Sequence, residues 1–140
     1  MTEHLTRSEG ETAAVGRDIG RQLAAGDVVL LSGPLGAGKT AFTRGLAEGL
    51  GCDGDDVSSP TFAIIQEYRG KVPLQHVDLY RLTPVEVDDL GLEDLLEGSV
   101  MAVEWPDRWR RAPDAAWRVT LELAGESARK IRVEYVGRAS

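Results

Sequence analysis

The sequence of 140 residues contains no asparagine, one cysteine (Cys52) and two histidines (His4 and His76). One cysteine excludes an intramolecular disulfide, and so few thiols and imidazoles exclude the usual zinc sites. Without asparagine, the chain lacks both the Asn-Lys-x-Asp motif that selects guanine and the Mg²⁺-binding asparagine of a protein-kinase catalytic loop. The cysteine usage fits a reducing compartment, so we expect a cytoplasmic location.

Positive charge is also scarce, since 16 Lys and Arg residues stand against 23 Asp and Glu residues and give a net charge of −7. Binding along a nucleic-acid backbone requires a basic stripe, so extended direct binding of nucleic acid is not expected. The longest early apolar run is Val28–Leu31, from which we expect neither a signal peptide nor a membrane-spanning segment. The length and the 42% apolar content predict one domain over residues 1–140.

The spacing of apolar residues predicts alternating helices and strands. Apolar residues that recur every three to four positions predict three helices. The first covers residues 9–25, the second follows the glycine-rich segment 33–40 and stops at Gly51, and the third runs from Thr83 to Leu96. The first of these begins with the capping-box spacing of Ser8 and Glu11. Apolar runs or alternating apolar residues predict extended segments at 27–32, 62–68, 72–80, 100–103, 117–124 and 130–136.

Residues 33–40 read Gly-Pro-Leu-Gly-Ala-Gly-Lys-Thr and match the P-loop pattern G-x-x-x-x-G-K-S/T between a predicted strand and a predicted helix. Glycines allow a tight turn whose backbone N–H groups point at phosphate oxygens, aided by the N-terminus of the following helix. Lys39 is expected to reach the β- and γ-phosphates, and Thr40 to give its hydroxyl to Mg²⁺. The expected phosphate-binding residues are Leu35, Gly36, Ala37, Gly38, Lys39 and Thr40.

This motif sets the expected fold and nucleotide. The architecture is an α/β fold with a P-loop NTPase-like core, a mixed, mainly parallel sheet and a C-terminal antiparallel hairpin. Because the guanine-specifying motif cannot exist without asparagine, ATP is favoured over GTP. The expected cofactors are therefore ATP and Mg²⁺.

Mg²⁺ at a P-loop also requires a carboxylate at the end of a neighbouring buried strand, and two acids occupy such positions. Glu104 follows the apolar run Val100–Val103 as a Walker B acid does, and is predicted to bind Mg²⁺ or to act in catalysis; the alternative is a solvated strand-end acid. Asp78 ends the less apolar segment 72–80 and is predicted to be catalytic, with a turn cap as the alternative. His76 is more often structural than catalytic in such a position.

Three further features leave alternatives open. Thr61 lies where GTPase-like proteins place a switch threonine, but the same spacing suits an ordinary turn. Trp105 follows Glu104 and is expected to pack over the nucleotide, to dock on a partner, or to belong to the core. The cluster Arg108, Arg110 and Arg111 is interpreted as a solvated face rather than as arginine fingers.

Four segments together resemble a known family. They are Gly33–Thr40, Ser59-Pro-Thr-Phe62, His76-Val-Asp-Leu-Tyr-Arg81 and Glu104-Trp105, and in this order they resemble the TsaE family, the P-loop ATPases of bacterial tRNA threonylcarbamoyladenosine biosynthesis. The resemblance implies slow ATP hydrolysis by the isolated protein and action on two protein partners. These are the tRNA threonylcarbamoyl transferase and its companion subunit, so tRNA is reached only indirectly.

The resemblance also implies roles for individual residues. Thr40 and Glu104 resemble the Mg²⁺ residues, Asp78 and Thr61 resemble hydrolysis or switch residues, and Trp105 resembles a residue essential for function.

Two residues outside these segments resemble positions near the base or the ribose, namely Thr12 and Arg129. Pro34 departs from the family pattern, in which many members have Asp, but it occupies a variable position of the P-loop.

Two other functions fit a P-loop in a short chain. A small-molecule or nucleotide kinase usually carries a lid, and no insertion between Asp78 and Glu104 is large enough for one. A nucleotide-gated binding module with vestigial activity is the other alternative, which the intact Lys39, Thr40 and acidic pair argue against.

Overall fold

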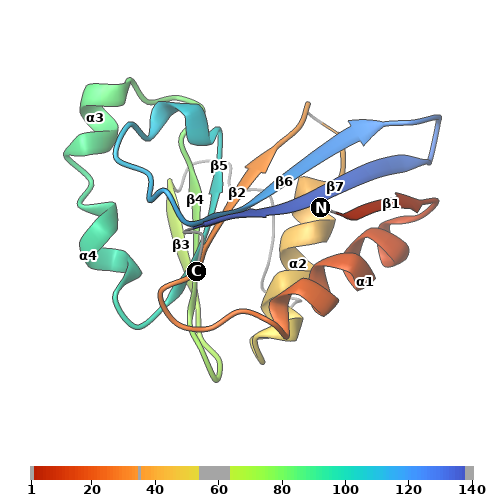
Figure 1. The fold of residues 1–140 in the computed structure, drawn as a ribbon, viewed down its shortest axis with the longest axis horizontal. Helices are drawn as coiled ribbons and strands as arrows, with labels where there is room; N and C mark the ends of the chain where they lie inside the picture. The colour runs from red at the N-terminus through yellow and green to blue at the C-terminus, as the bar shows by residue number, and fades with distance from the viewer. Residues whose placement is uncertain (1, 35, 54–63, 138–140) are drawn as a thin grey trace.

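The computed structural model describes residues 2–34, 36–53 and 64–137 (Figure 1). Strands in these residues are β1 Thr2–Thr6, β2 Val28–Ser32, β3 Ile65–Tyr68, β4 Leu74–Asp78, β5 Val100–Glu104, β6 Ala116–Leu123 and β7 Arg129–Val136. Helices are α1 Glu9–Gly20, α2 Lys39–Gly49, α3 Pro84–Asp88 and α4 Leu92–Leu96, with a 3₁₀ turn η2 at Pro106–Arg108. No helix within the described ranges is both long and apolar enough to cross a membrane.

All of these strands form one sheet, in the order β1-β7-β6-β2-β5-β4-β3. The pairs β6–β2, β2–β5 and β5–β4 in the middle are parallel, and the outer pairs β1–β7, β7–β6 and β4–β3 are antiparallel. The α/β fold with a mixed sheet and a C-terminal hairpin is therefore confirmed. Because β2, β5 and β4 are parallel, their carboxyl ends meet at one edge of the sheet, where ligands of α/β folds bind.

Three elements differ from the sequence predictions. Strand β1 was not predicted because its side chains are exposed except for Thr6, so it shows no buried periodicity. Helix α1 ends at Gly20 rather than near residue 25, since the chain turns at 21–27 and the Asp27 carboxylate accepts the N–H of Ala24. The helix predicted from Thr83 to Leu96 is two short helices, because Gly91 between them has a φ of +67°.

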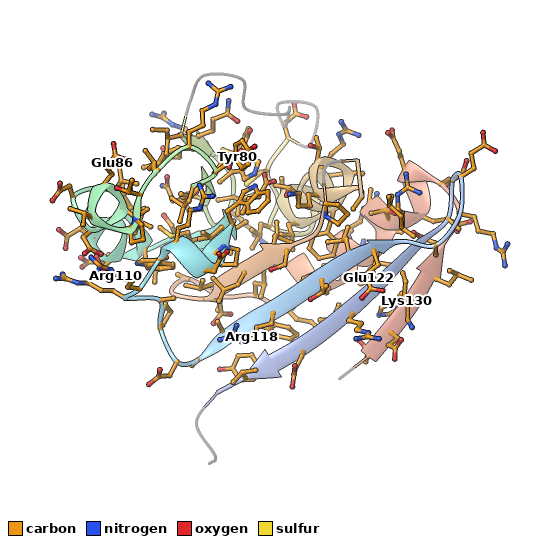
Figure 2. All side chains as sticks on the ribbon, turned by 90° about the horizontal axis from the view of Figure 1, so that it is seen from above. Tyr80, Glu86, Arg110, Arg118, Glu122 and Lys130 are labelled. Carbon is orange, nitrogen blue, oxygen red and sulfur yellow. The ribbon has the colours of Figure 1, made fainter. Side chains whose placement is uncertain are left out.

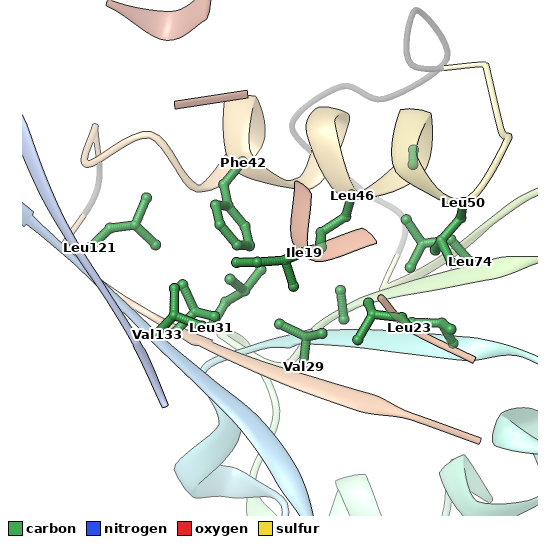
Figure 3. Close-up of a cluster of buried hydrophobic side chains, with 14 of the residues drawn as sticks. Ile19, Leu23, Val29, Leu31, Phe42, Leu46, Leu50, Leu74, Leu121 and Val133 are labelled. Carbon is green, nitrogen blue, oxygen red and sulfur yellow. The ribbon is translucent and has the colours of Figure 1, made fainter. Parts of the chain in front are cut away.

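Helices cover both faces of the parallel part of the sheet, as Figure 1 shows. On one face, Ile19 of α1 and Phe42 and Leu46 of α2 pack on the sheet residues Val29 and Leu31 (Figure 3). On the other face, α3 and α4 contribute Val87 and Leu92 to a second cluster with sheet and loop residues. The outer strands β6 and β7 face this first cluster with Leu121 and Val133 (Figure 3) and carry polar side chains such as Arg118, Glu122 and Lys130 on their other face (Figure 2).

Helices α1 and α2 touch backbone to backbone. Four glycines lie at the contact: Gly16, Gly20, Gly45 and Gly49. A Cβ atom on Gly45 would lie 1.9 Å from the carbonyl oxygen of Ala13, and one on Gly16 would lie 2.2 Å from that of Phe42. Both distances are far below any real contact, so only glycine permits this approach, which holds α1 against the helix that begins at Lys39.

We therefore expect Gly45→Ala to lower the free energy of unfolding by about 3 kcal/mol or to prevent folding, because the helices must separate. The matched control is Gly10→Ala in the exposed first turn of α1, where a Cβ meets only Ser8 Oγ at 3.8 Å. That variant should be slightly more stable, by about 0.5–1 kcal/mol. Urea unfolding followed by circular dichroism measures both; equal stability of the two variants would contradict the glycine contact.

Candidate phosphate-binding site

The glycine-rich segment 33–40 links β2 to α2, so the predicted order of strand, loop and helix is confirmed. Gly38 is the N-cap of α2 and has a φ of +97°, a conformation that side chains disfavour. No side chain of the described residues caps this helix, and its first turn carries no acid. The positive end of the helix dipole therefore has neither a side-chain cap from the described part of the chain nor a carboxylate of its own first turn, which suits an anion such as a phosphate.

The ammonium group of Lys39 lies beside the carboxylate of Glu104, with Nζ 3.5 Å from Oε1. The second carboxylate oxygen, Oε2, lies 2.7 Å from Nε2 of His76. The three residues are 8%, 7% and 2% exposed, respectively. The P-loop lysine, the predicted Walker B acid and the histidine of β4 therefore form one buried charged group.

Strand pairing explains why these residues meet. Glu104 at the end of β5 is in register with Leu31 of β2 on one side and with Asp78 of β4 on the other. Residues two apart on a strand share a face, so His76 and Asp78 lie on the same face as Glu104. The end of β2 leads directly into the P-loop, which brings Lys39 to this edge.

Burial by itself would raise the pKa of the Glu104 carboxyl. The hydrogen bond from His76, together with the charges of His76 and Lys39, outweighs burial and holds the pKa below its usual range. Glu104 is therefore ionised at neutral pH and acts only as an acceptor. An ionised carboxylate and a threonine hydroxyl are oxygen donors of the kind Mg²⁺ prefers, so Glu104 and Thr40 fit this ion.

Asp78 ends β4 next to Glu104 in register. Its Oδ1 accepts the N–H of Tyr80 at 3.0 Å, which is the turn cap considered as the alternative role for this residue. The carboxylate thus fixes the start of the loop after β4. A catalytic role for Asp78 remains a prediction.

Aromatic rings cover the outer side of Lys39. The Trp105 ring lies 5.1 Å from Nζ of Lys39 and 5.0 Å from the ring of Tyr80, which is 55% exposed. Trp105 has a φ of +60°, which is unusual for a bulky residue and turns the chain sharply after Glu104. This wall separates Lys39 from the surface and presents an aromatic edge to the outside.

Arg108 is not part of a solvated face, so that interpretation of the arginine cluster is wrong for this residue. Its Nη1 donates to the carbonyl groups of Leu79, Tyr80 and Leu82, and its guanidinium lies over the rings of Tyr80 and Trp105. The short 3₁₀ turn η2 brings Arg108 back over the loop after β4. No sequence pattern indicates this contact, because it joins residues 26 to 29 positions apart.

Thr12 and Arg129 line the same cleft beside the P-loop. The cleft is lined by Ser8, Glu9, Thr12, Gly36, Gly38, Ala41, Ser127 and Arg129. Thr12 Oγ1 lies 2.7 Å from Thr6 Oγ1, and Arg129 donates from Nε and Nη2 to the Gly36 carbonyl at 3.2 and 3.0 Å. Only the resemblance predicted this pair, since nothing in the local sequence joins residue 12 to residue 129.

Two predicted site residues, Leu35 and Thr61, lie outside the described residues, so their roles remain predictions. Sequence reasoning placed His76 among structural residues and missed its bond to Glu104. The spacing of His76 and Asp78 was the available signal, because it puts both on one face of a strand.

Comparisons with known proteins agree with this geometry. Residues 6–131 match the model of the family described as threonylcarbamoyl adenosine biosynthesis protein TsaE. Proteins named tRNA threonylcarbamoyladenosine biosynthesis protein TsaE include one from Nostoc sp., 40% identical over 139 residues (95% of this chain, 85% of the relative). Another, from Bacillus subtilis, is 42% identical over 130 residues (91% and 81%). The crystal structure of Bacillus subtilis YdiB matches with a TM-score of 0.80 and 35% identity, covering 97% of this chain and 86% of that one.

The Arg108 contacts predict how the loop after β4 is held. We expect Arg108→Ala to speed amide hydrogen exchange at Leu79, Tyr80 and Leu82 by about tenfold or more, because three carbonyl groups lose a charged donor. Arg111→Ala, which removes a nearby exposed arginine, is the control and should leave these amides unchanged. Unaltered exchange in Arg108→Ala, measured by NMR, would show that the loop keeps its conformation without Arg108.

Proposed function

The chain belongs to the TsaE family, and from this premise we propose that it is the Mg²⁺-dependent ATPase subunit of tRNA threonylcarbamoyladenosine biosynthesis. The observation that carries the proposal is the buried contact between Lys39 of the P-loop and Glu104 at the end of β5. A lysine and an ionised acid beside an uncapped helix N-terminus are the groups that bind a nucleotide triphosphate and its metal ion. We also propose that residues 1–140 act as one domain, since one sheet runs through the described residues.

Each residue of the site has a proposed task. Backbone N–H groups of residues 36–40 bind phosphate oxygens, and the Lys39 ammonium neutralises their charge. Thr40 and Glu104 would hold Mg²⁺, which supplies charge stabilisation for the phosphoryl group that is transferred. Asp78 and Thr61 are proposed to orient the attacking water.

The cleft beside the P-loop is the proposed place of the adenosine. Thr12 forms its buried wall, and Arg129 ties the β6–β7 turn to the Gly36 carbonyl, so both residues would contact the base or the ribose. The cleft lies next to Gly38, where the phosphates would be bound. A base in this cleft and phosphates on the P-loop would together span one nucleotide.

The proposed partners are the tRNA threonylcarbamoyl transferase and its companion subunit. The names of the relatives place those proteins in this modification, but the net charge of −7 does not suit direct binding of tRNA. We propose that tRNA is reached through the partner proteins, in the cytoplasm where tRNA is modified. The exposed edge formed by Trp105 and Tyr80 lies beside Lys39, so a partner that contacts it would act directly on the nucleotide site.

The first test is phosphate release from ATP at increasing Mg²⁺ concentration. We expect Lys39→Ala to lose ATP binding, because the phosphates lose their principal cation. Glu104→Gln should bind ATP yet hydrolyse it about a hundredfold more slowly, since the neutral amide is a poor ligand for Mg²⁺. Glu122→Gln, an exposed acid on β6, is the matched control and should behave as the unaltered protein does. Equal rates for Glu104→Gln and Glu122→Gln would contradict the metal assignment, and phosphate transfer to an acceptor other than water would favour a kinase.

A second test concerns the partners. We expect Trp105→Ala to reduce the rate stimulated by the transferase pair at least about tenfold more than the intrinsic rate, because a central aromatic residue of an interface is lost. Tyr135→Ala removes an exposed aromatic residue on β7, in a strand that does not lead into the P-loop, and serves as the control. An equal loss of the two rates in Trp105→Ala would mean that Trp105 acts only on the nucleotide site.

A further inference from the structure

His76 is a fully buried histidine to which the proposed function assigns no role. Its side chain has no exposed surface, and Nε2 lies 2.7 Å from Oε2 of Glu104. The other ring nitrogen, Nδ1, is buried with no hydrogen-bond partner among the described residues. The imidazole thus directs its one hydrogen bond to Glu104.

The bond has a defined direction. A carboxylate that lies 3.5 Å from an ammonium group at one oxygen and 2.7 Å from an imidazole nitrogen at the other is an acceptor for both, so Nε2 carries the hydrogen and donates it. The two carboxylate oxygens then have different partners: Oε2 is held by the neighbouring strand, and Oε1 faces Lys39. A carboxylate held at one oxygen has a fixed plane, which leaves the other oxygen in a constant position.

We propose that His76 is a positioning residue for Glu104, and that its Nε2–H fixes Oε2 so that Oε1 stays directed at the cation site beside the P-loop. In the structure as it stands, that cation is the ammonium of Lys39. The role rests on the proposed function in so far as Glu104 is the Mg²⁺ ligand there. An outer hydrogen bond of this type tunes the affinity of a metal site without touching the metal.

Packing alone does not account for a histidine at this position. Leu74, two positions before His76 on the same face of β4, is buried and apolar. An apolar side chain at 76 would fill the same space and would avoid burying Nδ1 without a partner. The ring also lies near the Tyr68 ring, with 6.4 Å between centroids, but the contact that uses its polar nitrogen is the one with Glu104.

The first measurement needs no nucleotide. The side-chain ¹H–¹⁵N spectrum of the full chain contains only two histidines, and His4→Gln assigns the remaining signal to His76. We expect a slowly exchanging Nε2–H at low field, as for a bond to a charged acceptor, and an upfield shift of this proton in Glu104→Gln. A signal that exchanges rapidly, or one that does not respond to Glu104→Gln, would overturn the proposal.

The second measurement compares two substitutions in Mg²⁺-dependent phosphate release. His76→Met removes the donor at similar volume, and we expect the Mg²⁺ concentration for half-maximal rate to rise about tenfold or more. His76→Gln keeps an N–H donor within reach of Oε2 and should restore the requirement to within about threefold. Thermal unfolding of each variant shows whether a higher Mg²⁺ requirement comes from impaired folding. If His76→Gln restores the requirement, the change in His76→Met comes from the lost hydrogen bond.

The two proposals fail in different ways. If the unaltered protein hydrolyses ATP and His76→Met needs no more Mg²⁺, the positioning role is wrong and the ATPase assignment stands. If the unaltered protein shows no Mg²⁺-dependent hydrolysis with or without partners, the proposed function is wrong. In that case the spectrum still decides whether His76 holds Glu104.

Discussion

The approach of α1 to α2 is the constraint on which the site depends. Glycine at positions 16, 20, 45 and 49 lets the two helix backbones touch, so that α1 and α2 together cover one face of the parallel strands. The N-terminus of α2 is the end of the P-loop, and the first turn of α1 carries Thr12 to its side. The P-loop and the neighbouring cleft are therefore held by one contact between glycine-containing helices.

The second constraint is electrostatic. Lys39 and Glu104 are removed from solvent, and a buried ion pair gains little net stability because desolvation offsets the attraction. Stability therefore does not explain why both charges are buried here, whereas a function that needs both charges does. The hydrogen bond from His76 keeps Glu104 ionised and oriented, while the Trp105 ring lies against Lys39. The charges are thus arranged before any ligand arrives, which is what electrostatic preorganisation requires.

The outer part of the site is built from loops. Arg108 holds the loop after β4 by its carbonyl groups, and Arg110 forms an ion pair with Asp88 at the end of α3. The rings of Trp105 and Tyr80 are fixed by this framework yet remain at the surface. This edge is thus held from within by Arg108 and exposed to the outside at Tyr80.

The sequence by itself determined the P-loop, the buried strand before Glu104 and the C-terminal hairpin. These features are local: they depend on glycine spacing, on short apolar runs and on alternation, each of which is legible within about ten residues. Gly91 is a sequence signal for the break between α3 and α4, but the apolar spacing from Val85 to Leu96 continues across it and favours one helix.

Tertiary structure alone decided which distant residues meet. Strand register placed His76 against Glu104, the η2 turn placed Arg108 on the loop after β4, and the edge pairing of β1 with β7 brought together the two ends of the described chain. Arg129 on β7 reaches Gly36 of the P-loop in the same way, across 93 positions of sequence. These contacts depend on the order of strands in the sheet, and that order is set by the packing of the whole core rather than by any local pattern.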